Sequence, residues 1–312
     1  MSKIPLLRFG AILFVTVGLG NLATVQGQTA AARQRGVQGV TVPPQPVSAS
    51  PIGPYYALVI GNNNYKKLNK LQTAVSDADA VAQLLHDHFG FQTKVLHDAT
   101  RANILNALDD YQRLLPEKSN LLIYYAGHGH KDVSAGRAYW LPVDAQPDHS
   151  PNWINAVEIT DKLRAIHSRH ILVIADSCWS GDFTMISLVG SRPGPSTAAA
   201  SLAKVGPAIT PSEHNALLAT TLALKSRHIM SSGGDEPVAD GGGGGHSVFA
   251  GVLLQSLDDM KDDSFTGEAL LVQRVKPRVA GRSRQMPEYA VVRDAASDLG
   301  DFVFFRSKKR GK

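Results

Sequence analysis

The stretch Ile171–Gly181 reads ILVIADSCWSG, an apolar run that leads to Cys178, the only cysteine of the 312-residue chain. Aliphatic and β-branched residues followed by small and acidic ones are typical of a buried parallel strand at its carboxyl end. Open α/β sheets hold their reactive groups at that edge. We therefore expect a strand over 171–175, with Cys178 just beyond its end.

A second stretch of the same shape, Leu121–His130 (LLIYYAGHGH), brings His128 to the end of another expected strand, 50 residues before Cys178. A cysteine nucleophile needs a nearby base to form its thiolate, and histidine suits this role because its pKa lies near neutrality. Gly127 and Gly129 flank the histidine, and glycines allow sharp turns that point backbone amides toward an oxyanion. Together the two stretches predict a cysteine and histidine site at one edge of a sheet.

Hydrophobic spacing in the rest of the chain alternates between strand and helix patterns. Residues 74–89 and 104–115 carry apolar side chains at intervals of three and four, the spacing of one helix face. Further strands are expected at 55–60, 93–97, 121–126, 228–231 and 301–305, and further helices at 158–166, 247–260 and 266–275. Strands that alternate with helices pair in parallel through right-handed crossovers. The predicted fold class is α/β, a mostly parallel sheet of about six strands with helices on both faces.

The two ends of the chain differ in composition from its body. Residues 1–27 have the shape of a signal peptide, whose apolar run is shorter than the roughly 20 residues that span a bilayer. We expect export to the periplasm or the exterior, and an uncleaved membrane anchor is the alternative. Residues 28–54, rich in Ala, Gln, Gly and Pro, predict a disordered linker, and 307–312 a solvated basic tail. These ends hold the excess positive charge, so we expect no nucleic-acid partner.

The body, residues 55–306, is expected to form one domain. A loop at 185–213, rich in Pro, Ser, Ala and Gly, divides it into halves at 55–184 and 214–306. Exposed loops of this composition are preferred sites of proteolysis. A single cysteine excludes an intramolecular disulfide framework and a cysteine-rich zinc site.

The motifs YAGHG and DSCWSG, each at the end of an expected strand, resemble the two signatures of caspase-like cysteine peptidases, in particular the bacterial relatives of metacaspases. The interval of 50 residues is also about that between the caspase histidine and cysteine. The likeness runs from Tyr55 to Phe305 and includes ALVIGNNNY, LQTAVSDADAV, SSGGDEPVADGGGGGHSVFAGVLLQSL, QMPEYAV and GDFVF. It implies a caspase-hemoglobinase-like fold and peptide-bond hydrolysis through a thioacyl-enzyme.

The resemblance also implies a role for each site residue. His128 is the expected general acid and base, Cys178 the nucleophile, and the backbone N–H groups of Gly129 and Cys178 the oxyanion hole. Metacaspases select Arg or Lys before the scissile bond through acidic residues, and Asp77 and Asp176 fall at the matching places. Two carboxylates in one pocket complement a guanidinium. We expect peptide or protein substrates to be cleaved after Arg, with Lys second, and not after Asp.

Several features depart from the metacaspase pattern or extend it. Ala126 and Trp179 stand where many metacaspases carry serine and histidine. Only Asp182 follows the nucleophile closely, so neither a calcium site nor any other metal or cofactor is predicted, although several metacaspases depend on calcium. Arg192 and Lys204 lie in the loop 185–213 and are candidate sites of self-cleavage.

Two readings compete with a peptidase. A catalytically silent caspase-like module that binds partners is the first alternative, and the presence of both His128 and Cys178 argues against it. A nucleotide-binding α/β protein is the second. The glycine run at 241–245 lacks the Lys and Ser/Thr that complete a phosphate-binding loop, so we do not expect a nucleotide.

Overall fold

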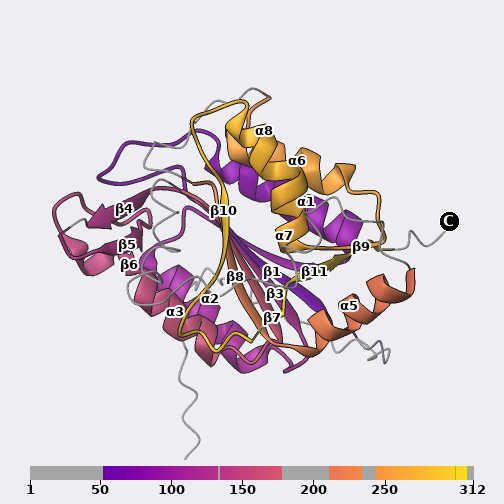
Figure 1. The fold of residues 1–312 in the computed structure, drawn as a ribbon. Coiled ribbons are helices and arrows are strands. Elements are labelled where there is room, and N and C mark those ends of the chain that lie inside the picture. Colours follow the sequence, from indigo (N-terminus) through magenta and orange to yellow (C-terminus); the bar gives the residue numbers. More distant parts are fainter. Residues whose placement is uncertain (1–51, 133, 178–210, 234–243, 299, 308–312) are drawn as a thin grey trace, which may run out of the picture. The chain divides into compact units, whose positions relative to one another are not determined.

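The computed structural model describes residues 52–132, 134–177, 211–233, 244–298 and 300–307 (Figure 1). Cys178, residues 1–51 and the loop up to residue 210 lie outside these ranges. Within the linker expected at 28–54, Gly53 and Pro54 are described, and their carbonyl groups accept hydrogen bonds from the side chain and backbone of Asn120. The chain is therefore anchored to the sheet just before the first strand begins.

A six-stranded sheet forms the centre of the described part, in the order β10, β8, β7, β3, β1, β2. Five strands run parallel, and β10 runs antiparallel to β8 at one edge. The strands are β1 (Tyr55–Gly61), β2 (Gln92–His97), β3 (Asn120–Ala126), β7 (His170–Asp176), β8 (Ser226–Ser231) and β10 (Glu288–Val291). Every residue of β3 and β7 is buried, because helices cover both faces, and this explains their nearly continuous apolar sequences.

The helices divide between the two faces of this sheet (Figure 1). One face is covered by α1 (Ala74–Phe89), α6 (Val248–Asp259) and the continuous segment α7 (Gly267–Leu270), η2 (Leu271–Val275) and α8 (Lys276–Ala280). The other face is covered by α2 (Arg101–Leu114) and α3 (Ala156–Ala165). A further helix, α5 (Pro211–Ala223), precedes β8 and begins inside the loop expected at 185–213.

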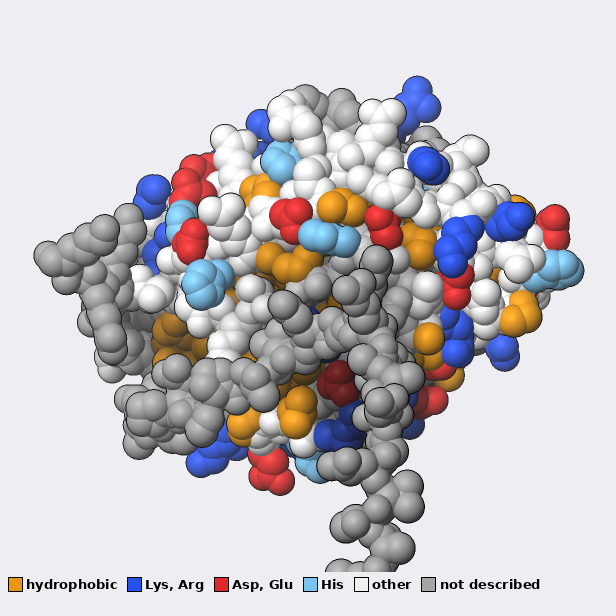
Figure 2. All heavy atoms as spheres, turned by 180° about the vertical axis from the view of Figure 1, so that it is seen from behind, with side chains coloured by type: hydrophobic (Ala, Val, Ile, Leu, Met, Phe, Trp, Pro, Cys, Tyr) orange, Lys and Arg blue, Asp and Glu red, His pale blue; other side chains and the backbone are white. Residues whose placement is uncertain are grey.

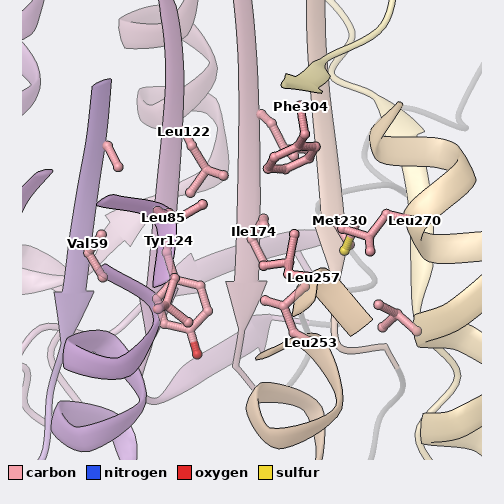
Figure 3. Close-up of a cluster of buried hydrophobic side chains, with 14 of the residues drawn as sticks. Val59, Leu85, Leu122, Tyr124, Ile174, Met230, Leu253, Leu257, Leu270 and Phe304 are labelled. Carbon is pink, nitrogen blue, oxygen red and sulfur yellow. The ribbon is translucent and has the colours of Figure 1, made fainter. Parts of the chain in front are cut away.

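Alternation along the strands builds a separate core on each face. Tyr124 and Ile174 pack with α1 and α6, whereas their neighbours Tyr125 and Val173 pack with α2 and α3. Figure 3 shows the first of these cores, in which aliphatic side chains from β1, β3, β7, α1 and α6 surround the ring of Tyr124. Successive residues of β3 and β7 therefore point to opposite faces of the sheet, as the two-residue period of a strand requires.

Two smaller sheets flank the central one. Strands β4 (Gly129–Asp132), β5 (Arg137–Trp140) and β6 (Ile154–Asn155) form an antiparallel sheet directly after β3, with the short helix η1 (Ser150–Asn152) before β6. Strands β9 (Ser264–Thr266) and β11 (Val303–Phe305) form a pair. The first of these sheets extends the chain from His128 and so belongs to the surroundings of the candidate site.

The expected fold class is confirmed, with one strand assigned differently. The apolar run at 301–305 was expected to be a strand, and it contributes β11, which pairs with β9 and not with the central sheet. The sixth strand of the central sheet is instead β10. Phe302 and Phe304 are fully buried in the core beneath α1, whereas Glu288 and Val291 of β10 are exposed at the sheet edge.

The surface and the helices give two further observations. Acidic, basic and histidine side chains are interspersed over the face that Figure 2 shows. In the part of the chain that the structure describes, no helix combines the length and the apolar character needed to cross a membrane.

Candidate active site

Strands β3 and β7 end side by side, which brings the two predicted motifs to one place. Ala126 is paired directly with Asp176, and the N–H of Gly127 donates to the carbonyl of Asp176 at 3.3 Å. His128 and Cys178 each follow two residues after this pair. Cys178 itself lies outside the described residues. The site is therefore described from the ends of β3 and β7 and the residues around them.

The His128 ring is held by the loop that follows β1. Its Nε2 lies 2.8 Å from the carbonyl oxygen of Asn69, and its ring centroid lies 4.5 Å from that of Tyr65. A carbonyl oxygen can only accept, so this contact requires the proton to be on Nε2. A neutral ring in this tautomer leaves Nδ1 free to accept a proton from a thiol.

The backbone of His128 is fixed by two tyrosines. Its N–H donates to the hydroxyl of Tyr65 at 2.7 Å, and its carbonyl accepts from the hydroxyl of Tyr125 at 2.8 Å. A Cβ at Gly127 would lie 2.7 Å from the Tyr65 hydroxyl oxygen, a separation too short for real atoms. A side chain at position 127 would therefore displace the hydroxyl that accepts from the His128 N–H.

Three asparagines organise the loop that carries Tyr65 and Asn69. The side chain of Asp98 accepts from the backbone N–H groups of Asn63 and Asn64 at 2.8 and 2.7 Å. Asn62 accepts from the N–H of Ala99 at 2.8 Å. Asparagine tolerates left-handed backbone, but none of these three has positive φ, whereas Asp98 has a φ of 49°. They act through hydrogen bonds across the loop.

The structure brings Asp77 and Asp176 together through one serine. Both carboxylates are buried, Asp77 in α1 and Asp176 at the end of β7. The backbone N–H of Ser247 donates to Asp77 Oδ2 at 3.2 Å, and its hydroxyl donates to Asp176 Oδ2 at 2.6 Å. Nδ1 of His246 contacts Asp77 Oδ1 at 2.6 Å. The start of α6 therefore joins the two acidic residues to which the resemblance assigned a shared pocket.

Burial dominates the ionisation of both carboxyl groups. Burial raises the pKa of Asp176 to about 7, with the Ser247 hydroxyl opposing this shift and the nearby charge of Asp77 adding to it. Burial also raises the pKa of Asp77, and the hydrogen bonds from His246 and Ser247 offset it only in part. Two desolvated acids that repel each other are a costly arrangement unless a cation neutralises them.

One oxygen of this pair is left for a further partner. Among the described residues, no hydrogen bond of ordinary geometry reaches Asp176 Oδ1, although the hydroxyls of Tyr124 and Ser232 lie near the carboxyl. Figure 3 shows the Tyr124 ring leaving the core toward the carboxyl ends of the strands, with its hydroxyl at the tip. Buried polar atoms normally have partners, so this oxygen differs from the other three carboxylate oxygens of the pair, which all accept hydrogen bonds or contact His246.

The structure also shows the positions of Gly129 and Asp144. Gly129 opens β4 opposite Trp140 and is half-buried, while the other expected oxyanion donor, the N–H of Cys178, lies outside the described residues. Asp144 lies in a turn, and its side chain accepts from the backbone N–H of Arg101 at the start of α2 at 3.0 Å. In the described ranges no group of three or more His, Cys, Asp or Glu side chains is placed to hold a metal.

Sequence reasoning did not identify Tyr65, Asn69, His246 or Ser247 as site residues. The contacts of Tyr65 and Asn69 to His128 span about 60 residues of sequence. Ser247 was recognised as a helix start, and its hydroxyl does cap α6 by accepting from the N–H of Ala250 at 2.9 Å. Nothing in the local sequence indicates that the same hydroxyl also donates to Asp176.

Comparison with known proteins agrees with this geometry. A profile of the family described as "Caspase domain" matches residues 55–295, most of the chain. The chain therefore belongs to the caspase-domain family, and the resemblance to caspase-like peptidases is confirmed at the level of the family.

Relatives of known name match a shorter part. Mucosa-associated lymphoid tissue lymphoma translocation protein 1 from Homo sapiens is 32% identical over 123 residues, which is 39% of this chain and 15% of that protein. Its Mus musculus homologue is 31% identical over 123 residues, 39% of this chain and 14% of that protein. The match thus spans about one seventh of the length of these relatives. Among solved structures, the crystal structure of protein GSU0716 from Geobacter sulfurreducens has 18% identity and a TM-score of 0.49, covering 77% of this chain and 94% of that one.

Proposed function

We propose that the protein is a cysteine endopeptidase that hydrolyses peptide bonds after Arg, with Lys second. The observation that carries this proposal is the buried pair Asp77 and Asp176, joined through Ser247 beside the strand end that leads to Cys178. Membership of the caspase-domain family supports peptidase chemistry. The carboxylate pair supports the choice of a basic side chain.

The charge around the pair favours a cation from outside. Among the described residues, no Lys or Arg side chain makes an ion pair with either carboxylate, and His246 is the one basic partner, bound to Asp77. A guanidinium that enters this site would relieve the repulsion between the two carboxylates and give Asp176 Oδ1 a donor. Arg is preferred to Lys because its planar fork of donors can bond two carboxylates at once.

The histidine geometry supports a proton-transfer role. With Nε2 bonded to Asn69, Nδ1 of His128 would take the thiol proton from Cys178, and the thiolate would attack the carbonyl carbon of the substrate. The backbone N–H groups of Gly129 and Cys178 would stabilise the oxyanion. His128 would then give its proton to the leaving amine, and water would hydrolyse the thioacyl-enzyme by the reverse transfer.

A thiol-directed electrophile that carries an arginyl side chain separates this proposal from a silent binding module. We expect a single covalent adduct at Cys178, located by mass spectrometry, and labelling by an aspartyl analogue that is roughly 100-fold slower. The Asp176→Asn variant should lose the preference for the arginyl reagent while still reacting with a small alkylating agent. No adduct under reducing conditions would support the silent module.

Export and self-cleavage are further proposals about the whole chain. The expected signal peptide at 1–27 and the loop residues Arg192 and Lys204 lie outside the described residues. If the pocket selects Arg and Lys, cleavage of the loop between the two halves by the enzyme itself follows from the same specificity. Such nicking should disappear in the Cys178→Ala variant.

A further inference from the structure

An aromatic patch lies on the small sheet next to His128. It consists of His130 in β4, Tyr139 in β5 and Trp153 just before β6, all of them half-buried. The ring centroids of His130 and Trp153 are 4.6 Å apart, and those of Tyr139 and Trp153 are 5.4 Å apart. None of these side chains has a role in the proposed chemistry described above.

The patch faces the same side of the small sheet as His128. In β5, Ala138 and Trp140 are buried, and Trp140 stacks on Tyr125 in the core at 4.4 Å, so Tyr139 between them points outward. His130 is paired directly with Tyr139 and shares that outward face. The N–H of Leu141 donates to the carbonyl of His128, which continues the ladder and places His128 two residues from His130 on the same side.

One apolar cluster connects the patch with the histidine. Tyr65, whose ring lies against His128, packs in a cluster that also contains Leu141, Tyr139 and Trp153. Trp153 is held firmly, because its indole N–H donates to the carbonyl of Gln146 at 2.9 Å and its own carbonyl accepts from Arg101 at 3.2 Å. The patch is therefore held in place by these contacts, and it lies next to His128, the proposed general acid.

The patch and the acidic pair belong to opposite faces of the central sheet. Asp77 and Ser247 come from α1 and α6, whereas Trp140 and Ile154 attach the small sheet to the core formed with α2 and α3. The scissile bond would lie between them, at the ends of β3 and β7. The residue before that bond would occupy the acidic pocket, so the chain after it would pass His128.

We propose that His130, Tyr139 and Trp153 form a subsite for an aromatic or large apolar side chain within the first three residues after the scissile bond. This inference rests on the proposed function, because the assignment of direction depends on proton transfer from His128 to the leaving amine. A half-exposed aromatic surface is stabilised most by a flat apolar side chain that covers it, because aromatic pairs attract each other beyond the effect of burial alone.

Binding to the Cys178→Ala variant tests the subsite without any turnover. Four peptides are compared, identical up to their single Arg: one has three glycines after it, and in each of the other three Phe replaces one of these glycines. We expect at least one Phe peptide to bind about 10-fold more tightly than the glycine peptide. Trp153→Ala should remove this ratio, Trp153→Phe should retain most of it, and Leu114→Ala, an exposed apolar residue on α2, should not change it.

The outcomes separate this inference from the proposed function. Equal binding of the Phe and glycine peptides would overturn the subsite, even if both peptides are cleaved after Arg by the wild type. A ratio that persists in Trp153→Ala, or a preference for Lys over Phe at these positions, would also overturn it. If binding does not depend on Arg but the Phe peptides still bind more tightly, the role of Asp77 and Asp176 in binding Arg is contradicted. The aromatic patch would still be supported as a binding surface.

Discussion

Ala126 and Asp176 are directly paired in the neighbouring parallel strands β3 and β7. In the sequence, His128 and Cys178 each follow two residues after a member of this pair. This relationship explains how groups 50 residues apart in sequence belong to one site. It also places the buried carboxylate of Asp176 at the end of β7, two residues before Cys178 in the sequence.

The hydroxyl of Tyr65 should matter for turnover more than for substrate binding. Tyr65→Phe keeps the ring against His128 but leaves the histidine N–H without its acceptor, so we expect kcat to fall about 10-fold with little change in KM, and stability to fall by about 1 kcal/mol. Tyr111→Phe is the matched control, because it removes a buried hydroxyl bond to Ala57 far from the site. Equal kinetics of the two variants would contradict a positioning role for Tyr65.

Asp98 should control the loop that supplies Asn69. Asp98→Ala removes the acceptor for two backbone N–H groups and places alanine at positive φ, so we predict a fall in kcat of roughly 10-fold from a poorly held His128. Asp98→Asn, which tolerates this backbone and keeps one oxygen, should retain most activity. Asp294→Ala changes another residue at positive φ, at the far edge of the sheet, and should leave kcat unaffected.

The Ser247 hydroxyl should set the pH dependence of binding. Asp176 must be ionised to bind a cation, so arginyl peptides should bind the Cys178→Ala variant more weakly as the pH falls below about 7. Adding Ser247→Ala removes the bond that opposes the raised pKa, and the transition should move to higher pH. Thr100→Ala also removes a helix cap but does not touch the pocket, and an identical shift in that variant would contradict this explanation.

Asp176 should lower the stability of the free protein at neutral pH. Its pKa is raised by folding, from an ordinary value near 4 to about 7, so its stabilising contribution is complete below about pH 4 and is lost as the pH rises toward 7. Asp176→Asn should therefore increase the free energy of unfolding near pH 7.5, on the order of 1–4 kcal/mol, while weakening arginyl binding. Denaturant unfolding of both proteins at several pH values measures this.

The effect of Asp176 is measured as the difference in the free energy of unfolding between the wild type and Asp176→Asn, because other groups also change the pH profile of each protein. Burial lowers the pKa of His170 to about 4, and this group loses its contribution as the pH falls below about 6.5, in the opposite direction. His170 is present in both proteins, so the difference between them isolates Asp176. If Asp176→Asn is no more stable than the wild type near pH 7.5, the prediction is contradicted. Other groups in the free protein would then already offset the cost of burying the Asp176 carboxylate.

Sequence patterns predicted the helices and strands whose side-chain spacing is regular along the chain. The helix at 74–89 was expected with the bounds that α1 shows, because Ala78, Val81, Ala82 and Leu85 form one buried stripe. The two strands that end at the site were predicted from uninterrupted apolar runs. Strand β10 was missed because an edge strand with exposed Glu288 and Val291 has no strong pattern of its own.

The parts of the site that sequence did not reveal are contacts between distant segments. Ser247 bonds to Asp77 across 170 residues and to Asp176 across 71. Serine before an apolar helix is an ordinary cap, and its second role becomes visible only when α1, β7 and α6 meet. The contact between Asn69 and His128 is of the same kind, since it uses a backbone carbonyl that no sequence motif can specify.

A cleavage profile over a peptide library, measured for the wild type beside Cys178→Ala, tests the central claim most directly. Our account predicts that the wild type cleaves after Arg, more slowly after Lys and not after Asp, and that the variant cleaves nothing. Cleavage after Asp without cleavage after Arg, or cleavage that persists in Cys178→Ala, would contradict it.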